Sequence, residues 1–214
     1  MERVMRLFRQ FGKAVFKRTT LATLLLPGCF ILPPSSLAQE SIGKTVRVEN
    51  QVSASIGDRA LKPQDAVFAS EIIEAGTASH GEILLNDDSK VLVGENSRVS
   101  LDDFVVGGKG FESGAIKVTK GAFRFITGNS KKGFLNVETP LSTIGVRGTL
   151  FDVYVADTGD TRVVLFKGAV EVCSSSNCIF TDKACDIIEV TGNGAQGLPY
   201  LRAGDREEED RKYS

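Results

Sequence analysis

The 214-residue chain has no tryptophan, two methionines and a single histidine, His80. Any Ser-His-Asp arrangement would have to use His80, and no Gly-x-Ser-x-Gly sequence is present to hold a nucleophilic serine. His80 stands in the stretch GTASHG, whose small residues predict a solvent-exposed turn. A run of about 20 apolar residues, the length that spans a bilayer as a helix, is also missing. These absences argue against a histidine-dependent hydrolase and against a spanning helix.

Cysteine is scarce too, with four residues in the chain. Cys173 and Cys178 flank the polar stretch SSSN between two apolar stretches, which predicts a hairpin closed by a disulfide. Pairings of Cys178 with Cys185 and of Cys173 with Cys185 stay open, and each choice leaves one thiol. Three cysteines spaced C-x4-C-x6-C, with no nearby histidine, supply only three ligands, so we expect no zinc site and no cofactor.

The first 38 residues have the layout of a secretory signal peptide. Six basic residues and one acidic residue give this stretch a net charge of +5, and an apolar run of 12 residues, 21–32, follows. Small residues at Ser36 and Ala38 then form a cleavage pattern. We expect residues 1–38 to be removed and the mature chain to be periplasmic or secreted. A lipoprotein signal is an alternative, because residues 26–29, LPGC, resemble a lipobox.

The rest of the chain is acidic and strongly patterned. It carries a net charge of −6, since the whole chain carries −1, and this balance argues against a nucleic-acid-binding surface. From Thr45 to Val190, apolar residues alternate with polar ones in short runs separated by Gly, Asn and Asp clusters. This period of two predicts an all-β domain of about 12 to 14 short antiparallel strands, stacked as a sandwich or a solenoid.

Three further expectations concern organisation. Residues 65–75 are the one stretch that fits a short helix. Residues 118–125 and 165–172 share the pattern φ-x-Lys-Gly-Ala-φ-x-φ, where φ is apolar, which suggests two similar corners in the fold. Residues 201–214, LRAGDREEEDRKYS, are rich in charge and poor in apolar side chains, so we expect a flexible polar tail over residues 191–214 after a β domain at 42–190.

Several stretches invite a catalytic or ligand-binding interpretation that their sequence does not support. Residues 105–114, VVGGKGFESG, lack the spacing of a phosphate-binding loop and predict a hairpin tip. Asp87, Asp88, Asp157 and Asp160 stand in turn clusters, where aspartate is favoured for backbone reasons. They lack the regular spacing of a calcium loop. A hydrolase that uses these carboxylates is a minor alternative, and Lys131 and Lys132 do not make a nucleic-acid surface.

The order of motifs resembles the FecR domain family. The matching stretches are GEILLNDDSKV at 81–91, ENSRVSL at 95–101, GAFRF at 121–125, TPLSTIGVRGTLFDV at 139–153 and VLFKGAVEV at 164–172. The residues that match the most specific motif are Thr139, Pro140, Val146, Arg147, Gly148, Thr149 and Phe151. The resemblance implies a periplasmic domain of inner-membrane regulators that respond to a TonB-dependent transporter and handle a sigma factor.

Neither a cytoplasmic sigma-factor segment nor a spanning helix is found in this sequence, so the expectation is limited to a stand-alone exported FecR-like domain. We expect a non-catalytic module that binds a protein or an envelope polymer in the periplasm. The alternative is a periplasmic sensor in transporter-linked signalling of the iron or siderophore type. The sequence predicts no catalytic residue and no metal ligand.

The GVRGT stretch within the most specific motif has a change of phase. Ile144 and Val146 lie on one side of an alternating strand, whereas Phe151 and Val153 have the opposite parity. The phase must therefore slip by one residue, and Gly148 is the residue that best permits a β-bulge. Arg147 has two interpretations: it pairs with a carboxylate and braces the corner, or it faces a ligand.

Overall fold

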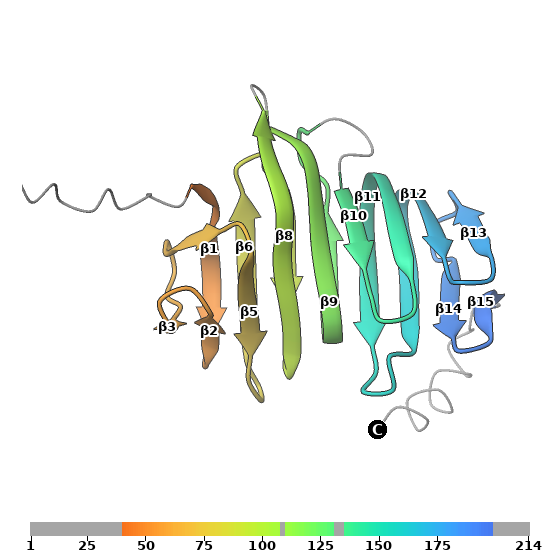
Figure 1. Cartoon of the computed structure of the whole chain (residues 1–214), viewed down its shortest axis with the longest axis horizontal. Helices are drawn as coiled ribbons and strands as arrows, with labels where there is room; N and C mark the ends of the chain where they lie inside the picture. Colours follow the sequence, from red (N-terminus) through yellow and green to blue (C-terminus); the bar gives the residue numbers. More distant parts are fainter. Residues whose placement is uncertain (1–39, 108–109, 131–134, 199–214) are drawn as a thin grey trace, which may run out of the picture. The chain divides into compact units, whose positions relative to one another are not determined.

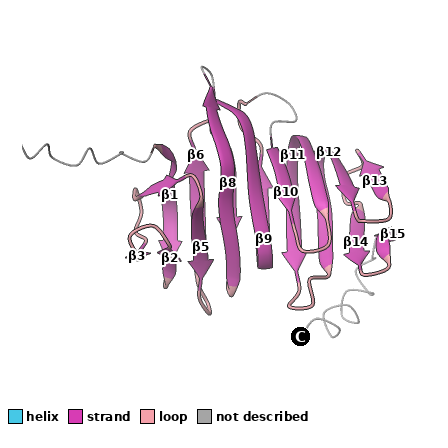
Figure 2. Cartoon of the chain, in the orientation of Figure 1, coloured by secondary structure: helices cyan, strands magenta, loops and turns pink. Residues whose placement is uncertain are grey.

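The computed structural model describes residues 40–107, 110–130 and 135–198, all within one compact unit, Ala38–Ser214. These residues form fifteen strands joined by loops, with no helix among them (Figures 1 and 2). The strands are β1 (Ser41–Glu49), β2 (Val52–Ala54), β3 (Arg59–Ala60), β4 (Ala66–Phe68), β5 (Glu71–Ala75), β6 (His80–Leu85), β7 (Lys90–Val93), β8 (Ser97–Gly107), β9 (Gly110–Ile126), β10 (Leu135–Glu138), β11 (Thr143–Val155), β12 (Thr161–Cys173), β13 (Cys178–Thr181), β14 (Ile187–Thr191) and β15 (Gly194–Leu198).

The strands form one hydrogen-bonded network folded into two layers. Layer 1 contains, in order, β4, β1, β6, β7, the second part of β9, the second part of β11, the first part of β12, β14 and β15. Layer 2 contains β3, β2, β5, β8, the first part of β9, β10, the first part of β11, the second part of β12 and β13. All pairs are antiparallel except β9 with β10. The all-β prediction is confirmed.

Three long strands pass from one layer to the other, and each does so at a glycine with positive φ. These are Gly121 in β9 (φ 96°), Gly148 in β11 (φ 62°) and Gly168 in β12 (φ 89°). The parity of buried residues changes at each glycine, because the side chains must face the core on both sides of the bend. Gly121 and Gly168 belong to the two Lys-Gly-Ala stretches of the sequence, so the predicted similar corners are confirmed.

The predicted slip in β11 is confirmed as well. The strand is one element, but its register with β12 shifts between Arg147 and Leu150. Ile144 and Val146 are buried before the shift, and Phe151 is buried after it. Gly148 therefore occupies the bulge, and the left-handed geometry there favours glycine.

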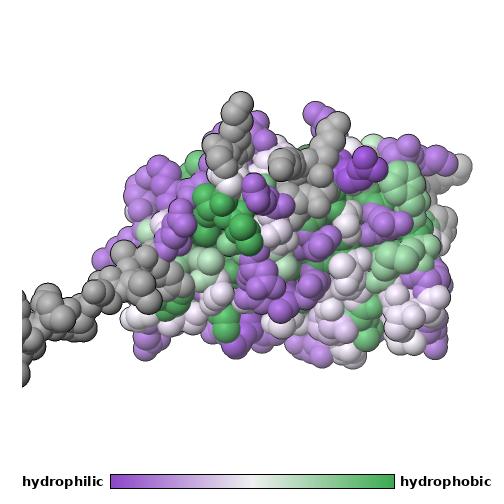
Figure 3. All heavy atoms as spheres, turned by 45° about the horizontal axis from the view of Figure 1, so that its top comes forward, coloured by the Kyte–Doolittle hydropathy of each residue, from purple (hydrophilic) through white to green (hydrophobic). Residues whose placement is uncertain are grey.

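The core lies between the two layers. Alternate residues of nearly every strand contribute to a single cluster of buried hydrophobic side chains. Phe125 and Phe151 of layer 1 meet with ring centroids 5.8 Å apart, and Val118 and Val137 of layer 2 line the same small internal cavity. Each fully buried valine, leucine or phenylalanine contributes about 1.5–3 kcal/mol. Figure 3 shows hydrophobic and hydrophilic side chains mixed over the face it presents, so apolar residues are not confined to the interior.

Two expectations about local structure are wrong. Residues 65–75 form the strands β4 and β5 instead of a helix, because alternate residues such as Val67 and Ile73 are buried and Ser70 turns the chain with positive φ. Part of the expected tail, residues 194–198, forms β15, which pairs with β14 through its backbone and needs few apolar side chains. With β13 and β15 the described residues hold fifteen strands, one more than the upper expectation.

The remainder of the tail, residues 199–214, and the predicted signal peptide, residues 1–38, lie outside the described residues, as do Lys131 and Lys132. The predicted hairpin tip at 105–114 is the junction of β8 and β9, where Gly107 pairs with Gly110.

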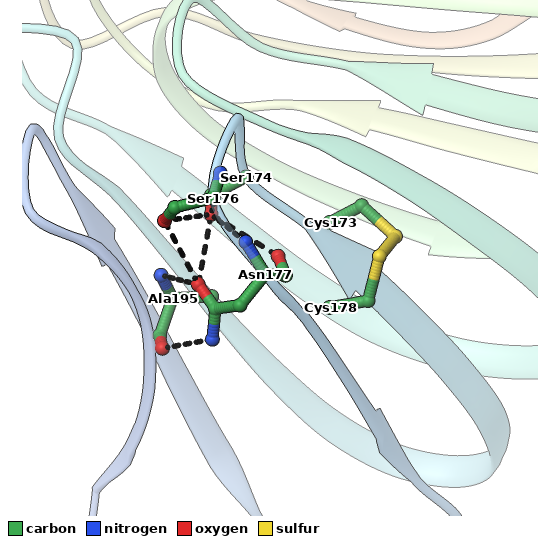
Figure 4. The surroundings of a disulfide bond; sticks show 6 residues. All are labelled: Cys173, Ser174, Ser176, Asn177, Cys178 and Ala195. Carbon is green, nitrogen blue, oxygen red and sulfur yellow. Dashed lines mark hydrogen bonds between the residues drawn. A yellow bond between two sulfur atoms is a disulfide. The ribbon is translucent and has the colours of Figure 1, made fainter.

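The predicted disulfide joins Cys173 to Cys178 across the β12–β13 hairpin, with Cα atoms 4.0 Å apart (Figure 4). Within the hairpin turn, the Asn177 side chain accepts from and donates to the backbone of Ala195 on β15. The disulfide thus constrains a turn that is also hydrogen-bonded to β15. Cys185 is the free cysteine among the described residues and is exposed.

Removal of this disulfide should destabilise the domain moderately. In the double variant Cys173→Ser, Cys178→Ser the unfolded chain is no longer constrained by the bond. Because the loop that the bond closes is short, we expect the free energy of unfolding to fall by about 2 kcal/mol. Thermal unfolding followed by circular dichroism should then show a midpoint about 4–8 °C lower. Cys185→Ser is the control and should leave the midpoint unchanged. An unchanged midpoint in the double variant would show that the bond does not constrain the unfolded chain.

Candidate functional site

A groove of about 500 Å³ crosses the outer face of layer 1, over β1, β6, β7, β9, β11 and β12. We call it the outer groove. Its floor includes Gly94 and Ala122, its side walls include His80 and Tyr154, and its back wall includes Arg124. This volume falls within the range of small-molecule sites.

Strand register explains why the face is hollow there. Tyr154 pairs with Ala122, and the backbone N–H of Gly94 donates to the carbonyl of Ala122 (2.8 Å). Gly81 pairs with Val93, which places His80 beside Gly94 in the same row. The row thus begins at the large side chain of His80, passes the small residues Gly94 and Ala122, and ends at the large side chain of Tyr154. The two walls are three strand spacings apart, or about 14 Å.

The back wall is a bidentate ion pair in the next row of the sheet. Arg124 on β9 donates from Nε to Oδ1 of Asp152 (2.6 Å) and from Nη2 to Oδ2 (2.8 Å). The guanidinium also lies over the ring of Phe166, 5.1 Å from its centroid. The hydrogen bonds that Arg124 donates to Asp152 raise the pKa of the guanidinium, so Arg124 stays charged at any physiological pH.

The other charged side chains around the outer groove are paired as well. Lys90 Nζ donates to Glu82 (3.0 Å), and Arg162 donates to Glu189 (2.9 Å). Arg47 pairs with Glu49, which also lies 3.8 Å from His80 Nδ1. Three arginines and three carboxylates line the groove, so its formal charge is zero with neutral His80. The groove thus combines apolar lining with paired charges of both signs, and no sign of charge dominates.

Most residues of the family motif serve the fold. Thr139 and Pro140 shape the turn between β10 and β11: the hydroxyl of Thr139 accepts from Ser142 N (3.0 Å) and from the hydroxyl of Thr161 (2.9 Å). Pro140 packs against Gly159 of the neighbouring turn. Neither residue lines the outer groove.

The buried motif residues stabilise the crossing of β11 between the layers. Val146 and Phe151 are core residues on opposite sides of the bulge. Thr149 is buried, and its N–H donates to the hydroxyl of Thr127 (2.9 Å) next to the bulge. Together with Gly148 they form a structural unit, which explains the sequence pattern without a ligand.

Arg147 is the exception among the motif residues. It lies on the outer face of layer 2 opposite Ala169 and is exposed. No ion pair of Arg147 is found within the described residues, so the expected brace to a carboxylate is not observed there. The outer face of layer 2 holds another pair, Asp102 with Lys117 (3.1 Å). Partial burial raises the pKa of Asp102, but hydrogen bonds from Ser100 and Lys117 outweigh it and lower the pKa overall.

The turn carboxylates are engaged in local structure. Asp87 is buried and accepts from the N–H and hydroxyl of Ser89, while Asp88 accepts from Asn129. Asp160 accepts from Thr158 at the other end of layer 1. The two turns are separated by about five strand residues, or roughly 16 Å, so they do not form one acid–base pair. Among residues 40–107, 110–130 and 135–198, no group of three or more candidate metal ligands is found.

The outer groove was not predicted from the sequence. His80 was expected in a turn, yet it begins β6 and lines the groove with its side chain mostly exposed. A signal was present: Gly94 and Ala122 are small residues at outward positions. It could not be interpreted without the register that places β7 beside β9.

The described residues form a β-sandwich domain whose outer face carries a groove. The family model described as FecR protein matches residues 71–171, from β5 into β12. Residues 71–171 are therefore FecR-like, as the motifs indicated. Most of the outer groove lies within the matched region, whereas Arg47 and Glu49 on β1 lie outside it.

Two crystal structures of a candidate anti-sigma factor from Parabacteroides distasonis, at 2.50 Å and 1.65 Å resolution, are similar to the chain. Each is 17% identical and covers 64% of this chain. The alignments span 62% and 64% of those chains, less than two thirds, with TM-scores of 0.49 and 0.48. At these values they support no conclusion about function. No curated protein matches the chain. No helix in the described residues is long and apolar enough to cross a membrane.

Proposed function

We propose that this chain is a non-catalytic signalling module of the cell envelope, and that its FecR domain senses a protein or an envelope polymer through the outer groove. The observation that carries the proposal is the groove itself. It lies on an otherwise regular sheet face, and its floor is hollowed by Gly94 and Ala122. Its side walls carry polar and aromatic side chains, as small ligand sites do.

The state of the candidate catalytic groups supports a role in binding. Asp87 and Asp88 hold a turn, and the ring of His80 lies 3.8 Å from the carboxylate of Glu49. The predicted signal peptide supports a location outside the cytoplasm. The acidic body of the chain disfavours nucleic acid as the partner.

The proposal is tested by filling the groove. Ala122→Trp places a large side chain on the groove floor while the side chain still points to solvent. In the native host, we expect a chromosomal Ala122→Trp strain to reproduce the transcript changes of a deletion strain. Ala60→Trp is the matched control, since Ala60 is an exposed strand residue on β3 outside the groove, and this strain should match the wild type.

Equal protein levels in the two variant strains, measured by immunoblot, separate loss of binding from loss of folding. If Ala122→Trp and the wild type have the same transcripts while the deletion strain differs, the groove is not the sensing site. A transporter-linked role of the iron or siderophore type adds one expectation. The altered transcripts should include transporter or metal-uptake genes, and iron limitation should enlarge the change.

A further inference from the structure

We infer that the outer groove binds a neutral carbohydrate, one or two pyranose rings of a glycan. This inference rests on the proposed function and names the chemistry of the ligand. It depends on four observations: the size of the groove, its charge balance, its amphipathic walls and its position in the middle of a sheet.

The size of the groove suits one or two sugar rings. Its volume is about 500 Å³, and the walls formed by His80 and Tyr154 are about 14 Å apart. The back is closed by Leu92 and Arg124, so the hollow has three walls. One or two sugar rings laid over Gly94 and Ala122 would lie between these walls. A large globular partner would need a broader surface, because stable protein interfaces bury about 800 Å² per partner.

The charge balance favours an uncharged ligand. Arg124 is already bound in bidentate fashion by Asp152, and Arg162 by Glu189. An anion would therefore have to compete with existing carboxylates, and a cation with existing guanidinium groups. Paired groups still have hydrogen-bonding capacity, since a carboxylate accepts about four hydrogen bonds and a guanidinium donates five. Hydroxyl groups, which both donate and accept, can use this capacity without displacing a pair.

The walls are also amphipathic in the way that a pyranose is. A sugar ring has a face of C–H groups and a rim of hydroxyls. The outer groove offers apolar area from Leu92, Val164 and Tyr154, which is 39% exposed, next to the polar groups of Glu82 and His80. Aromatic rings with a polar end are suited to such mixed contacts.

The position of the groove disfavours a peptide strand. Peptides that bind sheets add to an exposed edge, where backbone groups are unpaired. The floor of the outer groove is formed by β7 and β9, and each has a hydrogen-bonded neighbour on both sides. A ligand here must be recognised through side chains, which fits a sugar better than an extended peptide.

The test is a titration of the purified full chain with three neutral probes, chitotetraose, maltotetraose and cellotetraose, by isothermal calorimetry and by NMR shift perturbation. We expect at least one to bind with millimolar affinity or better. Tyr154→Ala should weaken that binding about tenfold or more, whereas Tyr154→Phe, which retains the ring, should keep most of it. Phe180→Ala is the aromatic control, since Phe180 is 58% exposed on β13, outside the groove.

Circular dichroism of each variant checks that the fold is kept. The inference is overturned if no probe binds at millimolar concentration, or if Tyr154→Ala binds as tightly as the wild type. The experiments distinguish failure of the sugar-binding inference from failure of the proposed function. If no sugar binds and Ala122→Trp still mimics the deletion, the groove senses another class of ligand, such as a peptide. If sugars bind and Ala122→Trp leaves transcripts unchanged, the signalling role fails and the sugar site stands.

Discussion

Gly168→Ala is expected to destabilise the β domain by about 4 kcal/mol, the sum of backbone strain and overpacking. Gly168 has φ 89°, a conformation that residues with a Cβ rarely adopt. A Cβ there would lie 2.2 Å from the carbonyl oxygen of Gly148, which is backbone and cannot rotate away. The two crossing strands β11 and β12 would have to separate at their common bend. Urea denaturation followed by circular dichroism measures the loss.

Gly148→Ala is the matched control. Gly148 also has positive φ, 62°, but a Cβ there would meet nothing within 4 Å. Only the left-handed backbone is disfavoured, so we expect a loss of about 1–2 kcal/mol. If the two variants lose the same stability, the close approach of the strands is not what requires Gly168, and strain alone explains the requirement.

Glu71→Ala is expected to cost about 3 kcal/mol, because it leaves a partly buried guanidinium without its carboxylate. Glu71 is 0% exposed. Its Oε1 accepts from Arg59 Nη2 (2.6 Å), and its Oε2 accepts from the N–H of Phe68 (3.0 Å). Arg59 in turn donates to the carbonyls of Ile56 and Ala66, so one carboxylate organises the corner of β3, β4 and β5. Denaturant unfolding measures the change.

Glu74→Ala is the control on the same strand. Glu74 pairs with Arg98, but the side chains are 48% and 47% exposed, and such surface pairs contribute at most about 1 kcal/mol. A loss below 1 kcal/mol for Glu71→Ala would show that water replaces the carboxylate without cost. The double variant Arg59→Ala, Glu71→Ala should be less destabilised than the sum of the two single changes, since it removes both partners and leaves neither charge unpaired.

The sequence predicted the fold class well because alternation is a local property. Ile144, Val146, Phe151 and Val153 reveal both the strand and the slip within it, and the slip indicates Gly148 as the bulge residue. The repeated Lys-Gly-Ala pattern predicted two similar corners, which Gly121 and Gly168 form. The Cys173–Cys178 pairing followed from a short polar loop between two apolar runs.

Local reasoning failed where a contact distant in sequence decided the structure. Residues 65–75 looked compatible with a helix, but Glu71 is held by Arg59, twelve residues earlier, and β5 pairs with β8. β15 has little apolar content and exists because β14 offers it a hydrogen-bonding edge. The motif residue Arg147, which carried the one open question of function, lies on the layer opposite to the outer groove.

The sequence by itself determined that this chain forms a β domain with FecR motifs and where its strands bend, and it favoured the pairing of Cys173 with Cys178. Each of these depends on neighbours along the chain, within the reach of parity, turn chemistry and short loops. Only the tertiary structure decided where a ligand could bind. The outer groove exists because hydrogen bonding sets Gly94 from one strand beside Ala122 from another, between His80 and Tyr154. That register is fixed by packing of the two layers, and no local pattern encodes it.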